Sequence, residues 1–367
     1  MQGVVLSGSS ARGVRRLARY EHGVLLEESD LREVICPGLS RVTADSLGLD
    51  KLRVMLGLGS TRNIELLVPS PKRRIRARGI SCHVMSRPLP EHSFQRVANA
   101  AEPSVIDLPK NVELFVESPC LSFLSAAAQL DRLVHKGVLG EQEADLRLLK
   151  LGVEECSTYV LDPRNPQAGA CKFDVEPVLT TSALNDYLDE AYGFEGLARA
   201  RRVAAWVFDG SASPMETFMY VALSLPTHLG GLGLPQPLVN HALPLEPWQR
   251  AILNHTERLT PDLYWEVYLI VLEYLGKEPH EGGVAQDEDM SRIQDYEVLD
   301  YRVLPVRYRH VKNPDSFNKL AVRLARLMGV RGGFDAPAWV DELVADGEFL
   351  ALQRMLFAMM LPPVEFC

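Results

Sequence analysis

Two short apolar runs within residues 260–283, TPDLYWEVYLIVLEYLGKEPHEGG, constrain the fold more than any other part of the chain. Both runs are rich in β-branched and aromatic residues, which is typical of β-strands. Asp262 stands at the start of the first run, and Glu273 stands near the end of the second. If the two strands pair as a hairpin, the alternation of side chains places these carboxylates side by side at one end of it.

Neighbouring carboxylates of this kind need a partner. Each costs free energy to bury, and together they repel one another unless a cation lies between them. Mg²⁺ is suited to this position, because proteins hold it through one or two carboxylates while water and phosphate oxygens complete its shell. Such a site can activate water and stabilise the charge of a phosphodiester transition state. The pair therefore predicts a site for Mg²⁺ or Mn²⁺ and a hydrolytic reaction.

The elements on either side of this pair indicate a mixed sheet with helices. The patterns predict helices over residues 213–225 and 287–301, a strand over 302–311 and a further helix over 314–330. A glycine-rich turn and an extended segment occupy residues 230–245. From residue 213 the predicted order is therefore helix, strand, strand, strand, helix, strand, helix.

The first half of the chain mixes both kinds of element. Residues 1–110 combine short apolar runs with Gly, Pro and Ser, which is typical of short strands and turns. Ser118 followed by Pro119 is a helix-start signal, with the serine as N-cap and the proline in the first turn. Ser29 is a second candidate cap. Helices are predicted over residues 28–34, 117–139, 141–151 and 182–207.

Length and pattern together predict an α/β (α+β) chain of two or three domains. We expect an N-terminal α+β domain over residues 1–205, a mixed sheet flanked by helices over 206–330, and a helical extension over 331–367. The N-terminal part carries no clear motif, so we expect it either to select a substrate or to bind a protein partner.

The charge of the chain leaves room for a local nucleic-acid contact. A formal net charge of −9 argues against a protein that coats itself in nucleic acid, but it permits a local basic groove. Residues 71–78, PKRRIRAR, are the densest basic cluster. Alternation would place its arginines on one face of an edge strand, where they either contact phosphate or keep the edge from pairing. The arginines at 199–202 are interpreted as a solvated helix face. The candidate nucleic-acid-binding residues of the first cluster are Arg73, Arg74, Arg76 and Arg78.

Cysteine usage and hydropathy bear on the compartment. The six cysteines are scattered and form no C-x-x-C pair, which argues against a zinc ribbon or a disulfide scaffold and indicates reduced thiols. The first twenty residues contain no apolar secretory signal, and the sequence holds no run of roughly 18 apolar residues. We therefore expect a cytoplasmic protein with no membrane segment.

Six short motifs occur in a recognisable order: SPMET, GLPQPLVN, PDLYW, VLEYLGKEPH, DEDMSR and YRVLPV. Through these motifs, residues from about 211 to 325 resemble the PD-(D/E)XK nuclease superfamily. More narrowly, the segment is similar to the very-short-patch-repair-like and DUF559-type endonuclease domains, to which AbiEi-type proteins of bacterial defence and toxin–antitoxin loci are related. The resemblance covers about a third of the chain.

The resemblance implies a restriction-endonuclease-like fold, in which a mixed sheet is flanked by helices and the active site lies where two central strands diverge. It implies that Asp262 and Glu273 bind the metal, and that Glu216 adds a ligand directly or through water. His280 would lie near the scissile phosphate as a proton donor or orienting group. Arg292 would face a phosphate or brace a carboxylate.

The chain departs from the family pattern two residues after Glu273. The family has a charged residue there, which orients the water or stabilises the transition state, whereas this chain has Leu275. Lys277 lies two positions further on, a shift of about 7 Å along a strand, and is our candidate for the missing role. Glu281 replaces the second histidine of the family's pair.

Each candidate also has a purely structural explanation. Glu216 closes a Ser-Pro-Met-Glu capping box, and Asp262 follows a Thr-Pro pair and can be a turn residue. His280 can be an exposed loop residue, and Arg292 can be an ordinary ion-pairing residue. Glu273 is the hardest to explain in this way, because acids are rarely buried at the end of an apolar run without a partner.

These observations predict a metal-dependent endonuclease that acts on DNA in preference to RNA, of the bacterial defence or toxin–antitoxin kind. The alternative is a chain that keeps the fold but has lost part of the site, as Leu275 would allow, and acts as a nucleic-acid-binding regulator or an antitoxin-like module. A third hypothesis is a partner-binding toxin component with no nucleic-acid role.

Overall fold

The computed structural model divides the chain into two compact units, Met1–Phe208 (unit 1) and Asp209–Cys367 (unit 2). It describes residues 2–21, 24–34, 52–54, 56, 58, 62–99, 112–165, 170–253, 258–276, 284–332 and 338–362. The sequence pattern placed a boundary after residue 205 and a separate extension from 331, whereas the last helices cluster with the rest of unit 2. Each unit has its own sheet and its own buried core.

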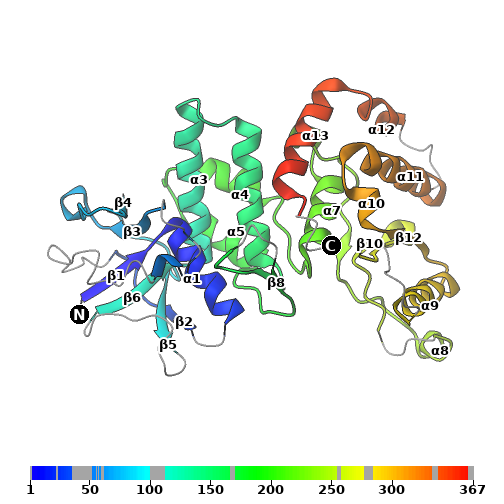
Figure 1. Cartoon of the computed structure of the whole chain (residues 1–367), viewed down its shortest axis with the longest axis horizontal. Coiled ribbons are helices and arrows are strands. Elements are labelled where there is room, and N and C mark those ends of the chain that lie inside the picture. Colours follow the sequence, from blue (N-terminus) through cyan, green and yellow to red (C-terminus); the bar gives the residue numbers. More distant parts are fainter. Residues whose placement is uncertain are drawn as a thin grey trace. The chain divides into compact units, whose positions relative to one another are not determined.

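Unit 1 is built around a six-stranded mixed sheet (Figure 1). Its spatial order is β2-β5-β6-β1-β3-β4. The pairs β1/β6 and β3/β4 are parallel, and the other neighbours are antiparallel. The strands are β1 (Gln2–Leu6), β2 (Val24–Ser29), β3 (Ile64–Val68), β4 (Ile80–Val84), β5 (Phe94–Asn99) and β6 (Val112–Glu117).

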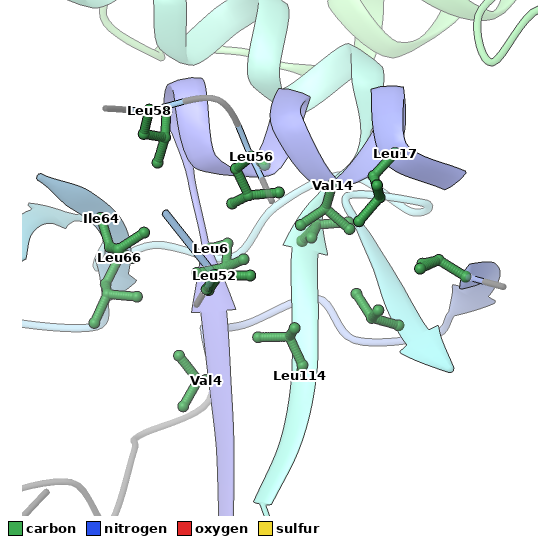
Figure 2. Close-up of a cluster of buried hydrophobic side chains, with 14 of the residues drawn as sticks. Val4, Leu6, Val14, Leu17, Leu52, Leu56, Leu58, Ile64, Leu66 and Leu114 are labelled. Atoms are coloured by element: carbon green, nitrogen blue, oxygen red, sulfur yellow. The ribbon is translucent and has the colours of Figure 1, made fainter. Parts of the chain in front are cut away.

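One face of this sheet is covered by α1 (Gly8–Tyr20). Figure 2 shows Val14 of α1 beside the strands that carry Leu6 and Leu114. Side chains alternate along a strand, so Val4 and Leu6 of β1 point to the same face and share this core. The apolar stripe of α1 and the alternation of β1 and β6 together explain why this layer forms.

A group of helices follows the sheet in unit 1. These are α3 (Pro119–His135), α4 (Glu141–Cys156), α5 (Thr181–Glu190) and α6 (Leu197–Ala204), with the short strands β7 (Val160–Leu161) and β8 (Cys171–Lys172) between α4 and α5. The predicted start of α3 is confirmed, because the Ser118 hydroxyl accepts the Leu121 N–H at 3.3 Å and Pro119 stands in the first turn. The sequence pattern allows one or two helices over 182–207, and the structure has two there, α5 and α6.

The interpretation of Arg199 as part of a solvated face is wrong. Its side chain is 3% exposed. Its Nε donates to Asp131 at 2.6 Å, its Nη2 donates to Glu141 at 2.6 Å, and its Nη1 donates to Asp145. Burying a guanidinium is costly unless it is paired, and three carboxylates provide the pairing here. Arg199 therefore ties α6 to α3 and α4.

Two further predictions in unit 1 are wrong. Residues 28–34 do not form a helix: Ser29 ends β2, where it pairs with Phe94, so ladder bonding to β5 prevails over the local capping signal. The cluster at 71–78 is not a strand but a short 3-10 helix, η2 (Pro71–Arg73), followed by a loop. Parallel strands cannot be joined by a tight turn, so the segment between β3 and β4 serves as their crossover.

Unit 2 contains a four-stranded sheet of order β12-β11-β10-β9. The pairs β9/β10 and β10/β11 are antiparallel, and β11/β12 is parallel. The strands are β9 (Leu238–Val239), β10 (Leu263–Trp265), β11 (Ile270–Tyr274) and β12 (Arg302–Val306). The longer helices are α7 (Pro214–Ser224), α9 (Val284–Val298), α11 (Pro314–Gly332) and α13 (Gly347–Met360). The short ones are η3 (Thr227–Leu229), α8 (Pro247–Arg250), η4 (Glu266–Tyr268), α10 (Tyr308–Val311) and α12 (Ala338–Leu343).

The predicted elements from residue 213 occur in the predicted order, as α7, β9, β10, β11, α9, β12 and α11, with the short helices η3, α8, η4 and α10 as unpredicted additions between them. The predicted strand over 302–311 is only half right. β12 ends at Val306, and the chain then forms α10 (Figure 1). The Arg307 N–H donates to His310 Nδ1 at 3.1 Å, and this contact caps the short helix and ends the strand.

The sheet of unit 2 is buried on both faces. Tyr264, Val271 and Val303 share one core with Tyr296 of α9. Leu263 and Leu272, which point to the opposite face, are fully buried as well. A separate aromatic cluster joins α7, α11 and α13: the ring centroids of Phe218, Phe317 and Phe357 lie 4.8–5.8 Å apart in edge-to-face pairs.

Two tryptophans of unit 2 differ in their exposure: Trp265 of β10 is buried, whereas Trp248 of α8 is 64% exposed. None of the helices in the described part of the chain is long and apolar enough to cross a membrane.

Candidate functional site

The two predicted acidic strands are adjacent and antiparallel. β10 pairs with β11 in the register Leu263↔Leu272, Tyr264↔Val271 and Trp265↔Ile270. Continuing this register by one residue brings Asp262 opposite Glu273. Side chains of directly opposite residues lie on the same face, with Cβ atoms about 5 Å apart. The hairpin turns at η4, so the two acids lie at its open end, as the alternation pattern predicted.

The surroundings of the Asp262 carboxyl disfavour its charged form. Its Oδ2 accepts the backbone N–H of Tyr274 at 2.6 Å, which ties the start of β10 to the end of β11. Burial raises the pKa of Asp262 well above its usual value, and the nearby carboxylates of Glu273 and Glu216 raise it further. The positive charge of Arg292 acts in the opposite direction but does not cancel these effects.

Glu273 is 3% exposed, and two residues of α9 contact its carboxylate. Its Oε1 accepts the hydroxyl of Tyr296 at 2.6 Å and lies 3.2 Å from Nη2 of Arg292. Burial raises the pKa of Glu273 to about 7, although Arg292 and Tyr296 both favour the charged form. Free energy is therefore gained if a cation stabilises this carboxylate near neutral pH.

Arg292 links the two strands of the hairpin. The same Nη2 that approaches Glu273 donates to the backbone carbonyl of Thr260 at 2.6 Å. Thr260 lies two residues before Asp262. Of the two roles implied for Arg292, the contacts correspond to bracing a carboxylate.

Glu216 lies in the first turn of α7 and is almost completely buried. The Ser213 hydroxyl accepts the Glu216 N–H at 3.2 Å, as expected for an N-cap. The Glu216 Oε2 accepts from Ala212 N–H at 2.8 Å and from the Asn240 amide at 2.6 Å. Burial raises its pKa, and its charge in turn raises the pKa values of Asp262 and Glu273. The capping role and proximity to the acidic pair therefore occur together.

The remaining candidate residues fall into two sets. Lys277 and His280 fall outside the described residues. Leu275 donates its backbone N–H to Val306 at 2.8 Å, so the pairing with β12 continues one residue beyond β11. In unit 1, the four arginines of the basic cluster are all exposed, on η2 and the loop before β4. These arginines are Arg73, Arg74, Arg76 and Arg78.

Sequence reasoning missed two residues that hold the acidic group. Tyr296 contacts Glu273 and Asn240 contacts Glu216. Tyr296 could have been found, because it follows Arg292 by four residues in a predicted helix and this spacing puts both on one face. No sequence signal points to Asn240, which reaches Glu216 through the tertiary fold.

The carboxylates of Asp262 and Glu273 are the metal-binding groups that this site offers. Among the residues that the structure describes, no group of three or more His, Cys, Asp or Glu side chains is arranged to hold a metal ion. Within the same residues, Asp262 and Glu273 each keep one oxygen without a hydrogen-bond partner. This arrangement suits a hard ion bound by two carboxylates and several waters, as Mg²⁺ is, and does not suit an all-protein cage.

Comparisons with known proteins add no further constraint. Protein-family models, curated proteins and solved structures were compared with the chain, and none of them matches it.

Proposed function

We propose that unit 2 is a metal-dependent phosphodiester hydrolase that cuts nucleic acid, DNA in preference to RNA, as an endonuclease. One observation carries the proposal: Asp262 faces Glu273 across a hairpin, with the charge of Glu216 close enough to raise the pKa of both. Glu216 and Glu273 are buried and Asp262 is half-buried, and carboxylates in such surroundings without sufficient compensating charge are unfavourable in a purely structural role. A divalent cation bound between these carboxylates would compensate their charge.

The arrangement of the sheet supports the proposal. Glu273 lies on β11 and Asp262 immediately precedes β10; these are the two central strands of a four-stranded mixed sheet, and helices flank it. A restriction-endonuclease-like fold requires the same placement. The sequence motifs that resemble PD-(D/E)XK nucleases occur on these elements, from SPMET on α7 to YRVLPV on β12.

The proposed division of roles follows from the contacts. Asp262 and Glu273 would hold Mg²⁺ or Mn²⁺, and Glu216 would bind through water. A bound divalent ion supplies an activated water and neutralises charge on the phosphodiester. Arg292 keeps the two acidic strands together at Thr260 and Glu273. Lys277 is proposed to supply the positive charge that Leu275 lacks, and His280 is proposed as proton donor to the leaving group.

Strand cleavage tests the proposal. Purified protein with Mg²⁺ or Mn²⁺ is expected to nick supercoiled plasmid, and Glu273→Gln is expected to abolish nicking while keeping the fold, because glutamine preserves shape and one acceptor. Lys277→Ala is expected to give a smaller loss. If the wild-type protein cuts neither DNA nor RNA under any divalent-cation condition, the hydrolase proposal fails.

A second candidate function is favoured by one specific residue. Leu275 stands where the resemblance predicts a charged group, and an aliphatic side chain there neither orients water nor stabilises a transition state. A chain with this change could bind nucleic acid without cutting it and act as a regulator or an antitoxin-like module. Nucleic-acid binding without cleavage, in protein that still binds the cation, would favour this second function.

A further inference from the structure

Helix α9 presents two side chains to the same carboxylate oxygen. Arg292 and Tyr296 are four residues apart, so they lie on one face of the helix. The hydroxyl of Tyr296 donates to Glu273 Oε1 at 2.6 Å, and Arg292 Nη2 lies 3.2 Å from the same atom. Both contacts use Oε1, which leaves Oε2 without a hydrogen-bond partner among the described residues.

The two contacts differ in how firmly they are held. Tyr296 is completely buried, and its ring packs edge-on against Tyr301 at 6.5 Å. Tyr301 packs in turn against Tyr264 of β10 at 5.7 Å. The Arg292 side chain is 43% exposed. Because aromatic packing immobilises the ring, the Tyr296 hydroxyl is the more rigid of the two donors.

From this geometry we infer that Tyr296 is a positioning residue, which holds Glu273 by Oε1 and leaves Oε2 free to bind a cation together with Asp262. The inference rests on the proposed function for the role of the cation, but the contact itself does not depend on it. Metal-binding carboxylates are commonly oriented by an outer hydrogen bond of this kind, and its loss costs about tenfold or more in metal affinity.

Arg292 connects Glu273 on β11 to Thr260, which lies just before β10. By donating to Thr260 as well as approaching Glu273, it fixes the entry to β10 relative to the end of β11. The distance between Asp262 and Glu273 then depends on α9 rather than on the short hairpin alone. We therefore expect α9 to control both the orientation of Glu273 and its separation from Asp262.

A double-mutant cycle tests the contact without any metal. The substitutions are Tyr296→Phe, which removes only the hydroxyl, and Glu273→Met, which keeps the length of the side chain but removes the acceptor. We expect their effects on the urea midpoint to be non-additive, because either change alone breaks the same hydrogen bond. The matched control is Tyr301→Phe, a tyrosine of the same aromatic cluster that does not contact Glu273, and its effect should add to that of Glu273→Met.

Calorimetric titration with Mn²⁺ of the full chain tests the consequence. Tyr296→Phe is expected to weaken Mn²⁺ binding about tenfold, whereas Tyr301→Phe should leave the affinity within a factor of two of wild type. Equal losses in both variants would show that only the general packing of the cluster matters, and the positioning role would be rejected.

The two readouts separate this inference from the proposed function. If the wild-type protein binds no Mn²⁺ but the cycle shows coupling, the metal-dependent function is wrong while Tyr296 still positions Glu273. If Mn²⁺ binds but the cycle is additive and Tyr296→Phe binds as tightly as wild type, the positioning role is wrong and the proposed function stands.

Discussion

Glu65 of unit 1 shows how a half-buried acid behaves when hydrogen bonds compensate its charge. Its Oε2 accepts from the backbone N–H of Ser9 at 2.5 Å and from the Ser9 hydroxyl at 2.6 Å, and His83 lies 3.4 Å from Oε1. Burial alone would raise its pKa, but these donors prevail and lower it to about 2. Glu273 lacks comparable compensation, and its pKa moves in the opposite direction.

The lowered pKa of Glu65 predicts a specific dependence of stability on pH. Folded protein binds this proton less readily than unfolded protein, whose carboxyl has a pKa of 4.5. The contribution of Glu65 is therefore present above pH 4.5 and is lost as the pH falls toward about 2. Glu65→Gln should lower the urea midpoint at neutral pH and reduce its fall below pH 4.5. A parallel pH profile in the variant would contradict the hydrogen-bonded carboxylate described here.

Residue-scale patterns anticipated part of the candidate site. Alternation along two short strands was sufficient to predict that Asp262 and Glu273 face each other, because the period of a strand is fixed by its geometry. Helical spacing places Tyr296 on the same face as Arg292, but which carboxylate Tyr296 and Asn240 contact depends on how α9 and the segment after β9 pack. Contacts between elements are set by tertiary structure, and a single sequence does not record them directly.

At the scale of elements, α7 is held in place by aromatic packing. Phe218 of α7 meets Phe357 of α13 with ring centroids 4.8 Å apart, and Phe317 of α11 lies against both. All three side chains are buried. Because Glu216 stands in the first turn of α7, the same cluster determines where this carboxylate lies relative to the hairpin.

Removing one ring should therefore affect unit 2 strongly. Phe317→Ala is expected to lower the free energy of unfolding by about 3–5 kcal/mol, which is the range for deletion of a buried aromatic ring. Trp248→Ala, at an exposed position of α8, should change it by less than about 0.5 kcal/mol. Urea denaturation followed by circular dichroism measures both. Similar losses in the two variants would mean that the aromatic cluster does not support the fold of unit 2.

Elements with strong local signals were predicted well, and those with competing tertiary partners were not. α3 starts at Ser118 because its cap and its proline act locally. β2 overrides the capping signal at Ser29 because six consecutive residues pair with β5. The alternation of RIRAR predicts a strand for the basic cluster, but the parallel pairing of β3 and β4 requires a crossover there.

At the scale of the whole molecule, charge is distributed unevenly. The chain has a formal net charge of −9, yet Arg73, Arg74, Arg76 and Arg78 are exposed together next to β4. We propose that this loop contacts the phosphate backbone, because none of its arginines forms an ion pair with a carboxylate of the described residues, and exposed arginines of this kind bind phosphate with release of counterions.

Replacing the four arginines with glutamine tests this contact. We expect weaker binding to all DNA sequences alike, and a shallower dependence of log Kd on log salt concentration, because fewer counterions are released. The double variant Arg199→Gln/Arg202→Gln does not provide a clean control, since Arg199 is buried in the ion-pair network of α6. Arg147→Gln, on the exposed side of α4, is a better one and should leave the slope unchanged. An unchanged slope in the quadruple variant would assign the cluster to a solvated loop.

The central claim is that Asp262 and Glu273 together hold one divalent cation, and Mn²⁺ titration of the full chain by calorimetry tests it most directly. We expect one Mn²⁺ per wild-type chain, and loss of this binding in both Asp262→Asn and Glu273→Gln without loss of folded structure. Glu65→Gln, an acid of unit 1 whose carboxylate is already satisfied, should bind Mn²⁺ like wild type. Binding that survives both substitutions in the hairpin, or no binding in the wild-type protein, would contradict the claim.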